Sequence, residues 1–399
     1  MTTVDDIRAA HEALQGVALR TPMMESRWLT GVTGGAVHLK CENLQRTGSF
    51  KIRGAYVRIS RLSPEERRAG VVAASAGNHA QGVALAARQL GIKATVFMPE
   101  GAPIPKVKAT EGYGADVVFA GRYVDQSLQR AREHAAATGA VLIHPFDHPD
   151  IVAGQGTLGL EVLEQVPDLG SVLVPTGGGG LLAGVAIAVK ALRPDVRVVG
   201  VQAEGAAAWP GSLAEGSPRP LQTMQTMADG IAVGRPGEVT FEAVREHVDE
   251  IVTVTEESLS QALLALLERA KMVVEPAGAA AVAALLERPA DNPAPAVAVL
   301  SGGNVDPLLL GKVIRHGLVA AGRYLNLRVH VPDTPGGLAG LLSELAAVGA
   351  NVIEIAHERI SPSLSLDEAE VQVQLETRGE PHAEAVLARL RERGYRVFE

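Results

Sequence analysis

The sequence predicts an open α/β fold followed by a small α+β module. From about residue 70 onward, short β-branched runs alternate with Ala- and Leu-rich stretches, as in "GVVAAS" before "HAQGVALAARQL" and "SVLVP" before "LLAGVAIAVKAL". Continuous apolar strands separated by helices are typical of parallel strands that are covered on both faces. With 399 residues the chain is long enough for two or three structural units.

Further strands are expected along the first three quarters of the chain. They are "ATVFM", "ADVVF", "VRVVGVQ", "EIVTV" and "AVAVL", with helices such as "PKVKATEGY" and "VDQSLQRAREHAA" between them. The last helix of this part should run from about Pro307 to Ala321. Cys41, in "VHLKCEN", is expected to be a small buried residue in a strand.

The pattern changes after about residue 324. "LNLRVHV" alternates apolar and polar residues, as a strand with one wet face does, and "PDTPGG" supplies a turn. One helical stripe is then formed by Leu338, Leu341, Leu342, Leu345 and Val348. The strands "NVIEIAHERI" and "EAEVQVQLE", the helix "HAEAVLARLRER" and "YRVF" complete a βαββαβ order, which predicts a ferredoxin-like module. We therefore expect domains at 1–324 and 325–399.

Composition excludes several classes of partner and location. A formal net charge of −8, an aromatic content of 3% and the lack of a Lys/Arg run argue against nucleic-acid binding. The single cysteine excludes an internal disulfide and a Cys-based zinc cluster and is compatible with a reducing cytosol. No secretory signal is visible, and the apolar runs are shorter than the ~20 residues that cross a bilayer. We expect a cytoplasmic protein with no membrane partner.

A run of four glycines lies between a predicted strand and a predicted helix: Gly177, Gly178, Gly179 and Gly180. Residues without Cβ let backbone amides converge on an anion, and a helix N-terminus favours negative charge, so a phosphate is the natural ligand. A Walker A loop is excluded because no Lys-Ser or Lys-Thr follows, and the G-x-G-x-x-G pattern is not cleanly matched. Close packing of strand and helix remains the alternative explanation.

Two other corners carry polar side chains. "ASAGNHAQG" places Ser75, Asn78 and His79 at the carboxyl end of a buried strand, where open α/β sheets bind ligands. The alternative is a helix N-cap, which would explain one of the three. "LSGGNVDP" places Ser301 after another strand, and Lys51 in "TGSFKIRGA" stands between Phe and Ile rather than among polar residues. Together these segments predict a shared cleft.

Five motifs in this order resemble one enzyme family. They are "ENLQRTGSFKIRGA", "SAGNHAQG", "PTGGGGLLAG", "EPAGAAAVAA" and "LSGGN", and the similarity covers about residues 5–320. They resemble the threonine/serine dehydratase family of pyridoxal 5′-phosphate enzymes with the tryptophan-synthase β-subunit fold. The resemblance implies a two-lobed fold type II enzyme, with a smaller lobe at about residues 48–150 inserted into the larger one.

The resemblance also implies the roles of site residues. Lys51 would form the Schiff base with the cofactor. Further cofactor contacts are implied at Phe50 (ring packing), Asn78 (3′ oxygen), Gly177, Gly178, Gly179, Gly180 and Leu181 (phosphate) and Ser301 (ring nitrogen). The substrate carboxylate would be held by Ser75, Gly77, Asn78 and His79. A hydroxyl at the ring nitrogen does not stabilise its protonated form as a carboxylate does, which favours loss of a β-substituent over transamination.

These roles imply conversion of L-threonine to 2-oxobutanoate and ammonia. The alternatives are an L-serine dehydratase, a serine racemase, or a non-catalytic amino-acid sensor on the same scaffold. Eukaryotic serine racemases carry a serine where this chain has Ala76. No metal site is assigned: Glu204 lacks an acidic partner nearby, and His144 and His148 are interpreted as surface residues.

Two further interpretations concern the rest of the chain. Glu275 in "VEPAGA" either borders the cofactor or caps a helix. The segment "VPDTPGGLAGLLSEL" resembles an ACT-like domain, which implies feedback control of isoleucine biosynthesis by isoleucine or valine. The alternative is a dimerisation element with an empty ligand site. A homodimer or homotetramer is the default expectation for either.

Overall fold

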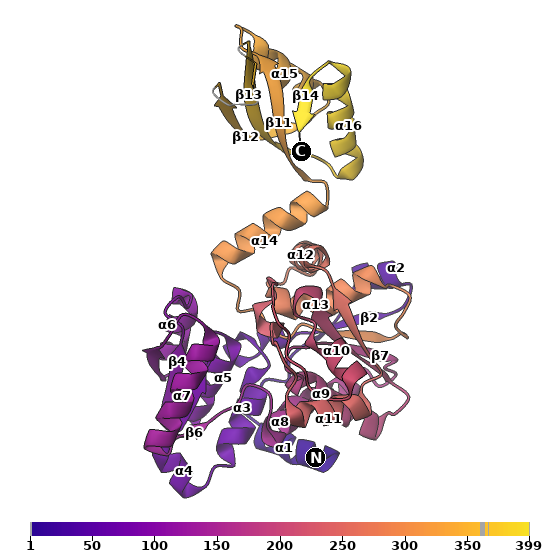
Figure 1. The fold of residues 1–399 in the computed structure, drawn as a ribbon. Coiled ribbons are helices and arrows are strands. Elements are labelled where there is room, and N and C mark those ends of the chain that lie inside the picture. The colour runs from indigo at the N-terminus through magenta and orange to yellow at the C-terminus, as the bar shows by residue number, and fades with distance from the viewer. Residues whose placement is uncertain (1, 360–363, 366, 399) are drawn as a thin grey trace. The chain divides into compact units, whose positions relative to one another are not determined.

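The computed structural model describes residues 2–359, 364–365 and 367–398. Contacts within the chain divide it into two compact units, one ending at Leu310 and the other beginning at Gly311 (Figure 1). No helix within the described ranges is long and apolar enough to cross a membrane. The two units are described separately.

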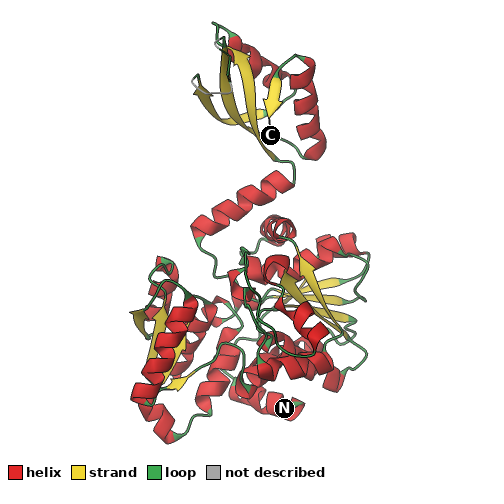
Figure 2. Cartoon of the chain, viewed as in Figure 1, coloured by secondary structure: helices red, strands yellow, loops and turns green. Residues whose placement is uncertain are grey.

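The larger lobe of the first unit is built on a six-stranded sheet (Figure 2). Its spatial order is β1 (Met23–Glu25), β2 (Val37–Lys40), β10 (Ala296–Val299), β7 (Ser171–Pro175), β8 (Arg197–Ala203) and β9 (Glu250–Val254). All neighbours are parallel except β1, which pairs antiparallel with β2. The apolar runs predicted as parallel strands are therefore confirmed.

Helices cover this sheet on both faces. One layer contains α1 (Val4–Ala13), α8 (Pro149–Gln165), α9 (Gly180–Leu192) and α11 (Glu238–His247), and the other contains α2 (Arg27–Thr33), α12 (Glu256–Ala265) and α13 (Pro276–Glu287) (Figure 1). The remaining helical segments are η1 (Glu42–Leu44), η2 (Arg46–Gly48), η3 (Glu204–Ala206), α10 (Ala208–Glu215), η4 (Asp229–Ile231) and η5 (Leu266–Ala270). Residues of α9 from Leu181 to Val189 are buried, as an all-apolar helix should be.

The smaller lobe has its own parallel sheet, in the order β5 (Asp116–Phe119), β4 (Ala94–Met98), β3 (Val71–Ala74) and β6 (Val141–Leu142). Its helices are α3 (Lys51–Ser60), α4 (Pro64–Ala69), α5 (Asn78–Gln89), α6 (Ile104–Gly112) and α7 (Val124–Thr138). Helix α3 packs against both α5 and α8, so it connects the cores of the two lobes. Lys51 is the first residue of this connecting helix.

The second unit contains α14 (Pro307–Ala320), most of which lies beyond Leu310, and an antiparallel α+β module. The module follows the order β11 (Tyr324–Pro332), α15 (Gly337–Ala347), β12 (Asn351–Glu358), β13 (Glu368–Glu376), α16 (Glu380–Glu392) and β14 (Arg396–Phe398). Its sheet has the spatial order β12-β13-β11-β14. The predicted βαββαβ order is confirmed, and Leu341 and Leu345 of the predicted stripe are buried in its core.

One local prediction is wrong. Cys41 is buried, but it follows β2 instead of lying in it. Its backbone, with φ −90° and ψ 64°, leaves the extended region and leads into η1. Burial raises the pKa of the Cys41 thiol to about 12, so it remains protonated at neutral pH.

Candidate active site

Lys51 lies half-buried at the start of α3. Its Nζ donates a hydrogen bond to the Pro145 carbonyl at 3.0 Å and lies 5.1 Å from the centroid of the Phe50 ring. Burial lowers the pKa of the Lys51 amine to about 8, although the charge of Glu275 opposes this shift. An amine with such a pKa is partly uncharged near neutral pH, as a nucleophile or base must be.

A buried ionic network fixes the helix that carries this lysine. Arg53 pairs with Glu42 at 2.8 Å and with Glu161 at 2.7 Å, and Lys40 pairs with Glu161 at 2.6 Å. These side chains are at most 5% exposed. Since Arg53 follows Lys51 by two residues, the network ties the first turn of α3 to β2 and α8. Loss of one partner from such a network costs about 3–5 kcal/mol, because a buried charge is left uncompensated.

The glycine run forms a loop with its N–H groups available. The Gly177 carbonyl accepts from Trp209 Nε1 at 2.7 Å, and the Gly178 carbonyl accepts from Thr240 Oγ1 at 2.6 Å. In the part of the chain that the structure describes, the N–H groups of residues 177–182 meet no protein acceptor. Six such groups at the N-terminus of a 13-residue helix match the predicted preference for an anion such as phosphate.

Close packing also explains these glycines. A Cβ on Gly178 would lie 2.4 Å from ring atoms of Phe146, and one on Gly179 would lie 2.4 Å from Trp209 Cζ2. Gly179 moreover has φ +96°, in the left-handed region that side chains disfavour. Close packing therefore accounts for glycine in this loop. It does not conflict with the predicted anion binding, which involves the N–H groups of the same residues.

The corner from Ser75 to His79 joins β3 to α5. The interpretation of Ser75 or Asn78 as a side-chain N-cap is wrong, because Gly77 is the N-cap and Asn78 already lies in the helix. Ser75 Oγ accepts from the Gly77 N–H at 3.1 Å. Among the described residues, the N–H groups of Ala76 and of residues 78–80 have no protein acceptor.

His79 contributes its backbone to this corner, while its ring is engaged elsewhere. The ring is buried, and Nε2 lies 2.8 Å from the Ile143 carbonyl. Burial lowers the pKa of His79 to about 3, so the ring is neutral and Nε2 is the donor. What the corner offers a ligand is therefore a set of amides, with the Ser75 and Asn78 side chains beside them.

Asn304, in the third corner, links the Ser75–His79 corner to the segment that precedes Lys51. Its Nδ2 donates to Asn78 Oδ1 at 2.8 Å and to the Thr47 carbonyl at 2.6 Å. Asn78 Nδ2 in turn donates to Glu275 Oε1 at 2.6 Å. Burial raises the pKa of Glu275 to about 7, with the charge of Asp229 adding to the shift. The Ser75–His79 corner, the Lys51 segment and the third corner therefore lie together, and Glu275 lies beside them without a side-chain cap to its helix.

The lysine segment and the Ser301 segment lie directly beside each other. The Phe50 N–H donates to the Ser301 carbonyl at 3.2 Å, and Ser49 pairs with Gly302 in an isolated antiparallel bridge. Ser301 is 4% exposed. Sequence reasoning did not assign Asn304, although it stands in the "LSGGN" motif, and it considered the loop of Phe146 only for its histidines.

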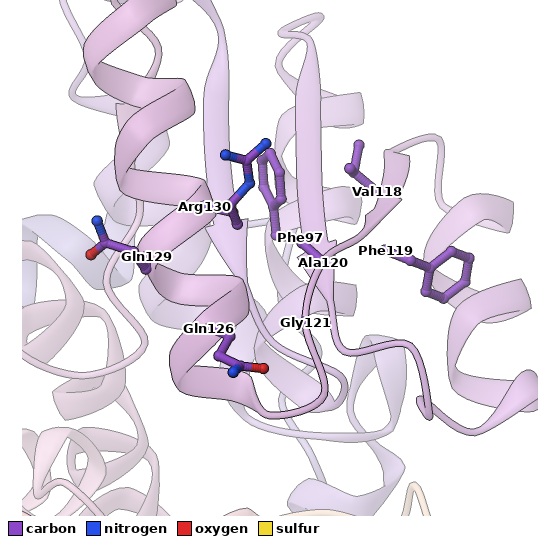
Figure 3. A pocket seen from close by; sticks show the side chains of 8 residues that line it. All are labelled: Phe97, Val118, Phe119, Ala120, Gly121, Gln126, Gln129 and Arg130. Carbon is purple, nitrogen blue, oxygen red and sulfur yellow. The ribbon is translucent and has the colours of Figure 1, made fainter.

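A separate surface cavity of about 430 Å³ lies on the smaller lobe (Figure 3). It is lined by Phe97, Val118, Phe119, Ala120, Gly121, Gln126, Gln129 and Arg130. None of these belongs to the segments around Lys51. Within the described residues, no group of three or more His, Cys, Asp or Glu side chains could hold a metal ion.

The site combines an amine of lowered pKa with a glycine loop of unpaired N–H groups and a second cluster of amides. Such features are typical of enzymes that hold a phosphorylated carbonyl cofactor on a lysine and bind an anionic substrate beside it. A family model described as pyridoxal-phosphate dependent enzyme matches residues 14–302, and an ACT domain model matches residues 326–394. The chain belongs to the family of pyridoxal-phosphate-dependent enzymes and carries a C-terminal ACT domain.

Individual relatives agree with this assignment. The L-threonine ammonia-lyase of Thermotoga maritima is 47% identical over 397 residues, which cover 100% of this chain and 99% of that protein. The structure of the processed form of threonine deaminase isoform 2 from Solanum lycopersicum has a TM-score of 0.75 and 37% identity, covering 78% of this chain and 93% of that one. Maize serine racemase has a TM-score of 0.75 and 36% identity, covering 80% and 98%.

Pyridoxal phosphate is the cofactor of this family, and the residues present fit it. The unpaired N–H groups of residues 177–182 suit its phosphate. The Lys51 amine suits its carbonyl group, and Asn78, held by Asn304 and Glu275, offers an oriented amide for its ring oxygen. The geometry thus provides a partner for each polar end of the cofactor.

Proposed function

We propose that this protein is a threonine ammonia-lyase, which converts L-threonine to 2-oxobutanoate and ammonia. The observation that carries the proposal is the Lys51 amine, whose pKa is lowered to about 8 and which stands among an anion-binding loop and a second amide cluster. Comparison with known proteins supports the proposal, because an L-threonine ammonia-lyase is similar to this chain over its full length. A substrate specificity for threonine is inferred from that similarity.

Each group of residues has a place in cofactor binding. Lys51 would hold the cofactor covalently, and Phe50 would pack against its ring. Asn78 would donate to its 3′ oxygen, Ser301 would face its ring nitrogen, and the N–H groups from Gly177 to Leu181 would bind its phosphate. When bound, pyridoxal phosphate supplies an electron sink for the charge that develops at the substrate Cα.

The chain's own residues then perform the proton transfers. The amides from Ser75 to His79 bind the substrate carboxylate and fix the orientation of Cα. The Lys51 amine, freed when the substrate amine replaces it, takes the Cα proton as general base. The β-hydroxyl leaves with a proton as water. Addition of one water to the remaining unsaturated amine gives the keto acid and releases ammonia.

Racemisation is less well supported than elimination. A racemase needs an acid on the face of the substrate opposite the lysine, and at the position where eukaryotic serine racemases carry a serine this chain has Ala76, which cannot donate a proton. L-serine remains a plausible second substrate, because one methyl group supplies only about 1–3 kcal/mol of discrimination. The non-catalytic sensor is disfavoured because Lys51, the glycine loop and Ser301 all lie at the site.

The test is a keto-acid assay with L-threonine, L-serine and D-serine on the purified, yellow protein. Lys51→Ala should abolish turnover, while Lys93→Ala, which removes a 75% exposed lysine, should not. Borohydride reduction followed by peptide mapping should label position 51 in the wild type. Full activity in Lys51→Ala, or no label at position 51, would end the proposal.

We also propose that the ACT domain binds an amino-acid effector, isoleucine or valine, and controls the catalytic unit. Titration of each amino acid against the initial rate and the melting temperature tests this. No change in either quantity at saturating effector would favour the alternative, a dimerisation element. Light scattering on the same protein samples measures the oligomeric state and checks the predicted homodimer or homotetramer.

A further inference from the structure

The turn between β6 and α8 is closed by one histidine ring. His144 Nδ1 accepts two backbone hydrogen bonds, from the Asp147 N–H at 2.8 Å and from the Phe146 N–H at 3.3 Å. The ring also meets the Phe146 ring edge-on, with centroids 4.7 Å apart and planes at 84°. A ring nitrogen that accepts from two donors carries no proton, so the turn requires neutral His144 with its proton on Nε2.

The same turn contacts both ends of the site. The Pro145 carbonyl accepts from Lys51 Nζ at 3.0 Å. The ring of Phe146 occupies the space that a Cβ on Gly178 would need. Asp147 accepts the N–H groups of residues 238 and 239 at 3.0 and 2.8 Å, at the N-terminus of α11. Three successive residues thus join the lysine, the glycine loop and the larger lobe.

The surroundings of His144 keep it neutral at ordinary pH. Burial is the main cause that lowers its pKa, to about 4, and the positive charges of Lys51, Arg132 and His148 act in the same direction. The carboxylate of Asp147 opposes the shift. The acceptor form of Nδ1 is therefore present throughout the neutral range.

We propose that His144 is a positioning residue for the reaction: its unprotonated Nδ1 holds the turn in the shape that places the Pro145 carbonyl at Lys51 and Phe146 against the glycine loop. The inference rests on the proposed function of Lys51. A proton on Nδ1 would point at the two N–H donors it now accepts from, and the turn would open.

Three variants test this role. His144→Ala removes the acceptor, whereas the Oδ1 of His144→Asn can accept the same N–H groups in an Asx turn and does not titrate. His148→Asn is the matched control, because His148 Nδ1 makes the same kind of bond, to the Asp150 N–H at 3.1 Å, but caps α8 and contacts neither Lys51 nor the glycine loop.

Kinetics with L-threonine provide the first readout. We expect His144→Ala to lower kcat about tenfold or more with KM changed less than about threefold, since the lysine and not the substrate is misplaced. His144→Asn should stay within about twofold of the wild type at neutral pH, because its Oδ1 restores the acceptor. Wild-type kcat in His144→Ala, or a loss of more than about tenfold in the kcat of His144→Asn, overturns the inference.

Amide hydrogen exchange on the cofactor-free protein provides a readout that does not depend on activity. The amides of Phe146 and Asp147 should exchange about tenfold or more faster in His144→Ala, and at the wild-type rate in His144→Asn and His148→Asn. Equal exchange in His144→Ala and the wild type overturns the inference. If the alanine variant fails to fold, His144→Asn decides, because exchange of these two amides faster than in the wild type would overturn the inference. A wild type without L-threonine activity would instead contradict the proposed function, which separates the two failures.

Discussion

Two corners of the catalytic unit use the same backbone arrangement in different surroundings. In the glycine loop and in the Ser75–His79 corner alike, a buried strand leads through glycine into a helix with unpaired N–H groups. The glycine loop is packed against Phe146 and Trp209, whereas a Cβ on Gly77 would meet nothing within 4 Å. The difference fits the proposed roles, in which the glycine loop holds a cofactor phosphate that stays bound and the Ser75–His79 corner binds a substrate carboxylate that must enter and leave.

The largest effect is expected when a methyl group is added to the glycine loop, which is packed against Phe146 and Trp209. Gly179→Ala would put a side chain at φ +96° and 2.4 Å from buried Trp209. Left-handed strain of about 1–2 kcal/mol and overpacking of about 1–3 kcal/mol predict a loss of roughly 2–5 kcal/mol in unfolding free energy. The bound cofactor, followed by its absorbance after dialysis, should also be lost.

The matched control is Gly211→Ala in helix α10. A Cβ there meets nothing within 4 Å, so stability should rise slightly, by about 0.5–1 kcal/mol, as for alanine in a helix interior. If Gly179→Ala unfolds like the wild type and keeps its cofactor, close packing is not what shapes the glycine loop.

The second prediction concerns the titratable group that only the Ser75–His79 corner has. The pKa of His79 is lowered to about 3, below its ordinary value of 6.5, so its contribution to stability is present above pH 6.5 and is lost as the pH falls toward 3. In His79→Gln, whose side chain still donates but does not titrate, the loss of unfolding free energy between pH 7 and pH 5 should be smaller by about 2 kcal/mol. Urea unfolding at pH 7 and pH 5 measures this.

Glu275 changes the stability in the opposite direction over an overlapping pH range. Its pKa is raised from 4.5 to about 7, so its contribution is present below pH 4.5 and is lost as the pH rises through 7. The comparison of His79→Gln with the wild type cancels this effect, because Glu275 is present in both. An identical pH dependence in both proteins would contradict the neutral, buried state assigned to His79.

Much of the fold could be predicted from the sequence because its signals are local. The strands "ATVFM", "SVLVP" and "EIVTV" match β4, β7 and β9 residue for residue, since each is a continuous apolar run between turn residues. The prediction for Cys41 is wrong by one position because a strand end depends on where the backbone turns. The domain boundary near residue 324 stays a prediction.

Site residues could be predicted only where they belong to a motif within one segment of the sequence. Lys51, the glycine run and Ser301 each stand in a motif, so sequence could name them, and the structure places their segments together. Asn304 and Phe146 act through partners about 226 and 32 positions away, at Asn78 and Gly178. Such contacts between distant residues cannot be predicted from periodicity or local composition, because they form only when the two lobes fold together.

The third prediction adds a methyl group to the Ser75–His79 corner, called the open corner because the space around Gly77 is free. The same methyl group should not be tolerated in the glycine loop. Gly77 has φ −136°, and its Cβ would meet nothing within 4 Å, so Gly77→Ala should fold with an unfolding free energy within about 0.5 kcal/mol of the wild type. The methyl group would project where the substrate carboxylate is proposed to bind. KM for L-threonine should therefore rise about three- to tenfold with cofactor retention unchanged.

A wild-type KM in Gly77→Ala would show that the substrate does not approach this corner. Loss of cofactor instead would mean that the two corners do not divide their ligands as proposed. Either result can be read directly against Gly179→Ala, because both variants add the same methyl group at the start of a helix.

The smallest effect is expected at Thr47, which is coupled to the open corner alone. This β-branched residue has φ +64°, its buried Oγ1 has no partner among the described residues, and its carbonyl accepts from Asn304, which also holds Asn78. Thr47→Gly relieves left-handed strain of about 1–2 kcal/mol but gives the unfolded chain about 0.5–1 kcal/mol of entropy, so stability should rise by no more than about 1.5 kcal/mol. Because Asn304 links Thr47 to Asn78 and not to the glycine loop, any kinetic change should appear in KM for L-threonine with cofactor retention unaltered. Loss of stability in Thr47→Gly would mean that the hydroxyl, and not the backbone shape, is what the fold requires at this position.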